Sequence, residues 1–156
     1  MNPYAYFLGD WDPRQVIQST YNHLNDVVRA LGPSVDLSPA PGKWSAREII
    51  CHLADTELVF AFRLRQSLAE PYHVIQPFDQ DSWAARYAIY DAACALEMFR
   101  AARDWNIKLI ASMTGEDLKK KLTHPERGEM ALGTIVETMA GHDLNHLAQL
   151  ETMLAA

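Results

Sequence analysis

The sequence predicts an all-α protein that folds as a four-helix bundle. Apolar residues recur with the helical period over four segments of about 20 residues, each about 30 Å long as a helix. Start and stop signals bound these segments, and none of them shows the alternation that is typical of a strand. At 156 residues the chain is long enough to bury one core, so we expect a single domain over residues 1–156.

The first helix is expected over residues 13–31. Asp12 precedes it as an N-cap, and Pro13 takes the first helical position, where a missing N–H has no cost. Gly32 follows the last residue of the apolar seam, and glycine readily adopts the backbone conformation that ends a helix.

A Pro-rich linker leads to the second helix, which begins at Ser45. Ser45 and Glu48 have the spacing of a capping box, in which each side chain binds the backbone N–H of the other residue. Trp44 precedes this cap and can pack on Ile49 as a hydrophobic staple. Pro71 limits the helix, because proline lacks the N–H that a helix interior requires.

A long connection, residues 71–91, separates the second helix from the third and includes a short helical turn expected near residues 82–87. About 20 residues can traverse a bundle about 30 Å long. The two helices could therefore be parallel, which would give an up-down-down-up order with a long crossover. Periodicity alone also allows the simpler up-down-up-down order.

The third helix is expected over residues 92–113, with Gly115 just beyond its end. The polar stretch that follows contains "KKLTH" and "GEMAL", which could pair briefly as a β-ribbon. The fourth helix begins at residue 132 or 134 and runs to the C-terminus.

Composition argues against several classes of function. The net charge is −6, the pI is near 5.4 and the only dense basic run is residues 119–121, so binding to nucleic acid is not expected. No segment has the roughly 20 apolar residues of a membrane span, and the N-terminus does not resemble a signal peptide, so we expect no membrane association and a cytoplasmic location. Cys51 and Cys94 lack the spacing of a disulfide framework and are expected to be buried, reduced thiols. Phosphate-binding loops and serine-hydrolase elbows have no counterpart in the sequence.

The stretch "GHDLNHLAQL" places His142 and His146 four residues apart, on one face of the fourth helix and in line with its apolar seam. Buried imidazoles need partners, and two neutral imidazoles at this spacing can bind one metal ion. His52, inside the second helix, is the best third ligand because it lies at the same level of the bundle. The alternative is that these histidines are hydrogen-bonded or partly exposed without a metal.

Other polar residues of the helices and connections are expected to have simpler roles. His23, His73 and His124 fall on a helix flank or in polar connections, which indicates solvated side chains. Cys51 is not expected to be a nucleophile at the site, since adjacent helix residues point about 100° apart. Asn106 interrupts the seam of the third helix, where an interhelical hydrogen bond is favoured over a place in a pocket.

Three carboxylates, Asp55, Glu57 and Asp143, are close in sequence to the candidate ligands. A carboxylate can orient a metal-binding imidazole through the second ring nitrogen. Glu57 is the foremost candidate, because its position falls near the core side of the second helix. The alternative for Glu57 is an ion pair with Arg63 or Arg65.

Two blocks, "KWSAREIICHLADTELVFAFRLR" and, roughly 80 residues later, "GHDLNHLAQL", resemble the DinB-like superfamily of metal-binding four-helix bundles. That family shares its name with an unrelated DNA polymerase. The resemblance extends from about Trp11 to Leu154 and implies that His52, His142 and His146 bind a divalent ion, zinc or nickel. It also implies the up-down-down-up order and a homodimer. Some members of the family are transferases that depend on small thiols such as bacillithiol and mycothiol.

Three imidazole nitrogens leave at least one coordination position open to water or substrate. The function that the resemblance implies is that of a metal-dependent thiol S-transferase, with a small-molecule thiol and an electrophilic substrate as partners, and the open position is consistent with it. A metal ion that binds such a thiol lowers its pKa and holds the thiolate for attack. Two alternatives stay open, a non-catalytic bundle that binds a metal or ligand and a metal-dependent hydrolase.

Overall fold

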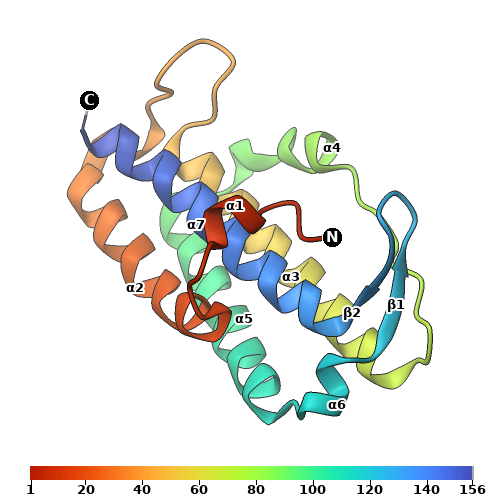
Figure 1. The fold of residues 1–156 in the computed structure, drawn as a ribbon. Helices are drawn as coiled ribbons and strands as arrows, with labels where there is room; N and C mark the ends of the chain where they lie inside the picture. The colour runs from red at the N-terminus through yellow and green to blue at the C-terminus, as the bar shows by residue number, and fades with distance from the viewer. Residues whose placement is uncertain (156) are drawn as a thin grey trace.

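Four long helices lie side by side in the computed structural model, which describes residues 1–155 (Figure 1). They are α2 (Pro13–Leu31), α3 (Ala46–Ala69), α5 (Ala92–Ser112) and α7 (Leu132–Leu154). The shorter elements are α1 (Ala5–Leu8), η1 (Gly32–Asp36), α4 (Gln80–Ala84), η2 (Tyr87–Ile89), α6 (Gly115–Leu118), β1 (Lys121–His124) and β2 (Gly128–Ala131). The predicted bundle is confirmed, and each long helix starts and ends within two residues of its expected bounds.

Local capping explains where three of the long helices begin. The side chain of Asp12 accepts a hydrogen bond from the backbone N–H of Arg14 at 2.9 Å, and Asp91 caps α5 in the same way. At α3 the capping box is present in full, with the Ser45 N–H donating to Glu48 Oε2 at 2.8 Å and the Glu48 N–H donating to Ser45 Oγ. These bonds set the start of α3 and therefore the position of each residue along it.

Helices α2 and α7 run in the same direction. Thr20 donates to Asp143 at 2.8 Å, and His23 pairs with Glu151 at 3.0 Å, so residue numbers rise together along the two helices. Against α5, by contrast, α2 is antiparallel, because Arg103 of α5 binds the Ile17 carbonyl of α2 while Arg14 reaches the carbonyl at the end of α5.

Helices α3 and α5 are also parallel. Near the start of both, Arg47 donates to the carbonyl oxygen of Tyr90 at 3.2 Å, and at mid-length Glu57 accepts from Arg103 at 2.7 Å. Figure 1 shows the long connection that carries the chain from the end of α3 back to the start of α5. The order of the bundle is therefore up-down-down-up, as the resemblance implied.

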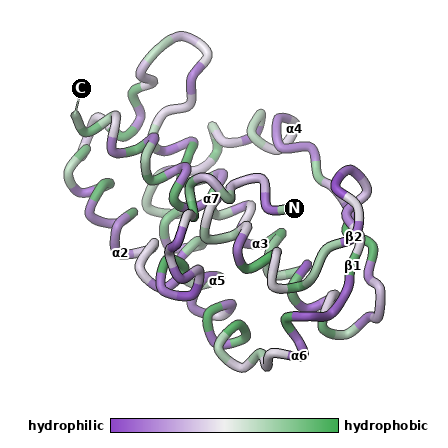
Figure 2. The backbone as a smooth tube through the Cα atoms, in the orientation of Figure 1, coloured by the Kyte–Doolittle hydropathy of each residue, from purple (hydrophilic) through white to green (hydrophobic). Residues whose placement is uncertain are grey.

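The bundle is filled by two apolar clusters with a layer of polar side chains between them. The clusters include Ile17, Phe60, Ile110 and Met139 at one level and Leu24, Leu53, Phe99 and Leu147 at the other. The residues between them on the four helices form what we call the polar band, namely Thr20, Glu57, Arg103, Asn106 and Asp143. Figure 2 shows hydrophobic and hydrophilic residues alternating along the long helices, as expected when one face of each lies in the core.

The β-ribbon that the sequence suggested is present. Strands β1 and β2 pair antiparallel with Leu122 opposite Met130, and Leu122 is buried in the core. An isolated bridge from Val74 to Thr123 ties the long connection to this hairpin. The hairpin and the connection thus meet beside α3 and α7, where they form walls of the site described below.

Two features differ from the sequence-based expectations. Cys51 is buried, as predicted, but Cys94 is exposed, because it lies in the first turn of α5 on the solvent side. The turn expected near residues 82–87 is split into α4 and η2, with Tyr87 buried against the core. Within residues 1–155, the helices lack the combination of length and apolar character that a bilayer crossing requires.

Candidate metal centre

Three histidines from two helices converge in the bundle. His52 of α3 and His142 and His146 of α7 are buried, and one nitrogen of each lies within 4.8 Å of the others. The Nε2 atoms of His52 and His142 are 2.9 Å apart, and the ring of His146 lies 4.5 Å from that of His142, centroid to centroid. We call these residues the histidine triad. The structure thus brings together all three residues that the sequence proposed as ligands.

Burial keeps the imidazoles of the histidine triad neutral. It lowers the pKa of His52 to about 3, with a further contribution from the nearby His146. It lowers the pKa of His146 to about 4, although a hydrogen bond to Gln149 acts in the opposite direction. The pKa of His142 is lowered well below its ordinary value, first by burial and then by the neighbouring His146, His52 and Arg103. Neutral imidazoles keep the lone pairs that a metal ion needs.

The polar atoms of the triad fit a divalent ion. Nε2 of His52 and Nε2 of His142 face each other. In a hydrogen bond between them, one nitrogen donates its proton and the other accepts with its lone pair. An ion would use both lone pairs. Two nitrogen ligands of a tetrahedral zinc ion lie roughly 3.3 Å apart. The His52 and His142 nitrogens are 2.9 Å apart and all three donor nitrogens lie within 4.8 Å of one another, so small movements of the rings would bring them to one ion.

Gln149 orients the third imidazole. Its Oε1 lies 3.2 Å from Nδ1 of His146, so the Nδ1–H donates to the amide oxygen and Nε2 keeps its lone pair. Sequence reasoning missed this residue, although its place one turn after His146 on the same helix face was the available signal.

None of the three carboxylates proposed to orient the ligands bonds to a triad imidazole in residues 1–155. Glu57 instead accepts from Arg103 at 2.7 Å and from Asn106 at 2.7 Å, so the alternative ion pair with Arg63 or Arg65 is also wrong. The reason is that α5 places the Arg103 guanidinium against Glu57 in the core. For Asn106, the favoured interhelical hydrogen bond is confirmed.

The other two carboxylates also have partners of their own. Asp143 binds Arg103 through both carboxylate oxygens and accepts a hydrogen bond from Thr20. Asp55 is hydrogen-bonded to Tyr87, and burial raises its pKa. Asp143 and Glu57 therefore belong to the polar band, and Asp55 to the contact between α3 and the long connection.

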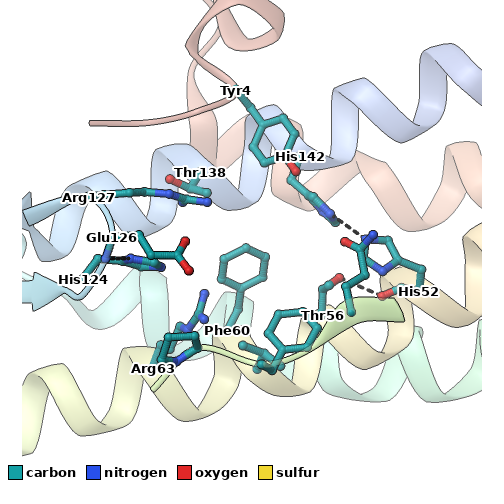
Figure 3. Close-up of a pocket in the computed structure, with 14 residues that line it drawn as sticks. Tyr4, His52, Thr56, Phe60, Arg63, His124, Glu126, Arg127, Thr138 and His142 are labelled. Carbon is teal, nitrogen blue, oxygen red and sulfur yellow. Dashed lines mark hydrogen bonds between the residues drawn. The ribbon is translucent and has the colours of Figure 1, made fainter. Parts of the chain in front are cut away.

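A pocket of about 200 Å³ opens from the histidine triad toward the hairpin. His52, His142 and Phe60 line one part of it, as Figure 3 shows, and charged side chains from α3 and the hairpin line the other. Those charged and polar residues are Arg63, His124, Glu126 and Arg127. We call this cavity the charged pocket.

A second, larger hollow of about 750 Å³ reaches the triad through His146. Its other lining residues include Trp44, Ile49 and Met153, so its walls are more apolar. Trp44 lies over His52 with ring centroids 5.1 Å apart. It therefore borders the site, and it also packs against the core cluster that contains Ile49, the residue onto which the sequence predicted it to staple. We call this cavity the apolar hollow.

Tyr4 is a further residue of the site that was not found from the sequence. It lines both cavities together with Gln80, and its ring packs edge-on against His142 at 5.2 Å. The segment that carries Tyr4 lies across α7 because Gly141 has no side chain. A Cβ at Gly141 would lie 2.6 Å from the Tyr4 carbonyl oxygen. A glycine inside a helical pattern was the available signal for such a close approach.

The remaining histidines correct another expectation. His23 is partly exposed and pairs with Glu151, in keeping with a solvated side chain. His73 and His124 are buried, so they are not solvated as the sequence suggested. Both lie next to the bridge between Val74 and Thr123 that joins the long connection to the hairpin, and Nδ1 of His73 lies 2.6 Å from Glu70.

Comparisons with known proteins agree with this fold. Residues 15–150 match the model of the DinB superfamily. A protein of Oceanobacillus iheyensis, named provisionally as a metal-dependent hydrolase, is 27% identical over 147 residues, which cover 88% of this chain and 86% of that protein. A Bacillus cereus protein with the same provisional name is 26% identical over 145 residues, covering 89% of this chain and 82% of that protein.

A solved structure shows the same architecture. YfiT from Bacillus subtilis, reported as a probable metal-dependent hydrolase with an unusual four-helix bundle topology, superposes with a TM-score of 0.80 at 21% identity. The match covers 92% of this chain and 86% of that one. At this identity the likeness concerns the fold, while the match of the family model spans most of the sequence. The chain therefore belongs to the DinB superfamily.

Proposed function

We propose that this protein is a metal-dependent enzyme in which the histidine triad holds one divalent ion, zinc or nickel. The observation that carries the proposal is the convergence of three buried, neutral imidazoles where two cavities meet. Nitrogen ligands suit zinc and nickel, and three protein ligands leave room for a reacting molecule, as in catalytic sites. The names of the relatives as metal-dependent proteins support the same interpretation.

Thiol transfer to a small electrophile is the reaction that the surroundings support best. His52 and His142 line the charged pocket and His146 lines the apolar hollow, so two organic molecules have room to meet at the triad. A bound ion would lower the pKa of a thiol that coordinates it and so favour the reactive thiolate. The thiol comes from outside the chain, because burial raises the pKa of Cys51 to about 11 and Cys94 lines neither cavity.

The residues of the chain then have distinct tasks in such a reaction. Gln149 holds the His146 ring in the tautomer that offers Nε2 to the ion. Trp44 and Phe60 place apolar surface next to the imidazoles, which limits the water around a reactive thiolate. Tyr4 lines both cavities, so it would contact and position the molecules in them.

Hydrolysis is the second candidate, favoured by the provisional names of the relatives. It uses the same residues, with water in place of the thiol, because an ion with an open position also lowers the pKa of bound water. The two candidates differ in one requirement. Transfer needs an added thiol and hydrolysis does not.

The metal half is tested by elemental analysis of protein purified without chelator and reloaded with zinc or nickel. We expect about one ion per chain in the parent and in His23→Ala, a matched control at a partly exposed histidine. His52→Ala and His142→Ala should lose the ion while circular dichroism shows them folded. Parent protein that binds no ion after reloading would overturn the proposal.

The reaction is tested with the metal-loaded parent and a chromogenic electrophile that carries an ester. A rate that needs both metal and added thiol, and that yields the thioether or thioester, supports transfer. Release of the acid without any thiol supports hydrolysis. Metal-loaded protein without turnover over a panel of thiols and esters would instead indicate a bundle that binds metal without catalysis.

A further inference from the structure

The end of the charged pocket away from the histidine triad holds two guanidinium groups. Arg63 comes from α3 and Arg127 from the turn between β1 and β2, so residues distant in sequence are brought together there. Figure 3 shows both side chains at the end of the pocket opposite His52 and His142. Their gathering is notable because the chain has 14 Lys and Arg against 20 Asp and Glu.

Neither guanidinium is paired with a carboxylate in the part of the chain that the structure describes. Within residues 1–155 no carboxylate forms an ion pair with Arg63 or Arg127. Arg63 donates to the Gln76 carbonyl at a long 3.4 Å, and its buried Nε has no partner among the described residues. A half-buried guanidinium with open donors is costly to leave without an acceptor.

The two arginines also disfavour each other. Burial lowers the pKa of Arg63, and the positive charge of Arg127 lowers it further. The same two charges, after burial, lower the pKa of His124 beside them. An arrangement in which positive groups raise one another's free energy is relieved when an anion enters between them.

Other residues hold Arg63 in place and set the balance of charge at this end of the pocket. The guanidinium of Arg63 lies over the Phe78 ring at 5.9 Å, a cation–π contact that restricts its movement. Of the described residues that line the pocket, Glu126 alone carries a carboxylate, and it is exposed on the hairpin turn. Its single negative charge leaves the two arginines with an excess of positive charge.

We propose that Arg63 and Arg127 form an anion-binding subsite that takes a carboxylate or phosphate group of the molecule whose other end reaches the histidine triad. The planar guanidinium forks of arginine match both anions. The inference rests on the proposed function in one respect, namely that the other end of this molecule reacts at the histidine triad. It adds the class of molecule to that function, namely a small acid that carries a thiol or electrophile at a distance from its anionic group.

The experiment measures binding to metal-free protein by calorimetry, so that it does not depend on metal loading or turnover. The probes are 3-mercaptopropionate and its uncharged primary amide, together with inorganic phosphate. In the parent at low ionic strength we expect at least one of the two anions to bind at least about ten-fold more tightly than the amide.

Variants locate the anion. Arg63→Gln and Arg127→Gln should each remove most of the discrimination between anion and amide, whereas Arg29→Gln, which removes the same charge from an exposed position on α2, should keep it. Glu126→Gln should bind the anion more tightly, because a competing negative charge is lost. Circular dichroism and thermal unfolding confirm that each variant is folded.

The inference is overturned if the parent binds neither anion more tightly than the amide, or if both arginine variants keep the parent's discrimination. The proposed function fails by a separate result, the absence of metal binding to the histidine triad. Anion discrimination that survives in His52→Ala would establish the subsite even in protein that cannot hold an ion. Metal binding without anion discrimination would leave the proposed function standing and reject the subsite.

Discussion

Arg103 and Asp143 form a doubly hydrogen-bonded ion pair in the core, one residue away from a proposed metal ligand. Nη1 of Arg103 donates to Oδ2 of Asp143 at 2.6 Å, and Nη2 donates to Oδ1 at 3.1 Å. The two side chains are 1% and 2% exposed, respectively. The pair joins α5 to α7, and Glu57 extends it to α3. The polar band therefore holds three helices together beside His142, the residue that precedes Asp143.

Replacing Arg103 by methionine should destabilise the protein by about 3–5 kcal/mol, because Glu57 and Asp143 are then left buried without their cation. The methionine keeps much of the apolar stem, so the loss reports mainly on charge and hydrogen bonding. Urea unfolding at neutral pH measures it. Arg100→Met, on the exposed face of the same helix, is the matched control and should change the unfolding midpoint little. A similar small effect in both variants would contradict the importance of the polar band.

The parts of the structure that the sequence predicted well depend on local signals. The caps at Asp12 and Ser45 involve residues two and three positions away, so their geometry follows from the helix itself. The same holds for His142 and His146, whose spacing puts both on one helix face. Choosing His52 as the third ligand required comparing its height along the second helix with that of the other two histidines along the fourth, and the family resemblance supported that choice.

The parts that the sequence did not predict depend on contacts between distant residues. Arg103 reaches Asp143 across 40 positions and Glu57 across 46, and no pattern in either helix names its partner. Tyr4 lies against the site because the N-terminal segment crosses α7. Arg127 reaches the charged pocket only because the hairpin folds beside α3 and α7. Such placements are decided by packing, which sequence periodicity does not encode.

Substituting Gly141 by alanine should displace the N-terminal segment from α7. The new Cβ would lie 2.6 Å from the Tyr4 carbonyl oxygen and 2.7 Å from the Tyr4 Cβ, so the backbone itself must move. Alanine favours a helix over glycine by about 1 kcal/mol, and a net loss of stability would therefore come from the clash. Amide hydrogen exchange over residues 4–8 should become faster.

Gly115→Ala is the control for this substitution, since a Cβ added at Gly115 would meet no atom of residues 1–155 within 4 Å. It should leave exchange in the N-terminal segment unchanged. If Gly141→Ala exchanged at the parent's rate over residues 4–8 and unfolded at a higher temperature, the close approach of Tyr4 would not hold in solution.

The two cysteines should differ strongly in reactivity. Burial raises the pKa of Cys51 to about 11, so at pH 8 almost none of it is thiolate, whereas Cys94 is exposed at the start of α5. A disulfide reagent should therefore titrate one thiol per native chain and two in urea. Cys94→Ser should abolish the native reaction, and Cys51→Ala should preserve it. Two fast-reacting thiols in the native parent would mean that Cys51 is accessible beside the metal centre.

Acid should destabilise the metal-free protein through the histidine triad. The ordinary pKa of histidine is 6.5, while burial lowers the pKa of His52 to about 3 and that of His146 to about 4 in the folded chain. Between these values the unfolded chain binds protons that the folded chain does not, so the free energy of unfolding falls as the pH falls from about 6.5 toward 4. Urea midpoints between pH 7.5 and 5 measure this loss, above the range in which most carboxylates titrate. A midpoint independent of pH over that interval would contradict the depressed pKa values.

Zinc or nickel should stabilise the folded protein against unfolding at neutral pH. An ion that binds only the folded chain stabilises it by about 2.7 kcal/mol when its free concentration is 100 times the dissociation constant. Because protons compete for the same nitrogens, the metal-dependent rise in the unfolding temperature should shrink as the pH falls below 6. His142→Ala should show no rise with metal, and His23→Ala should show the full rise. If both variants responded equally to metal, the ion would be binding outside the histidine triad, and the site proposed for catalysis would have to be abandoned.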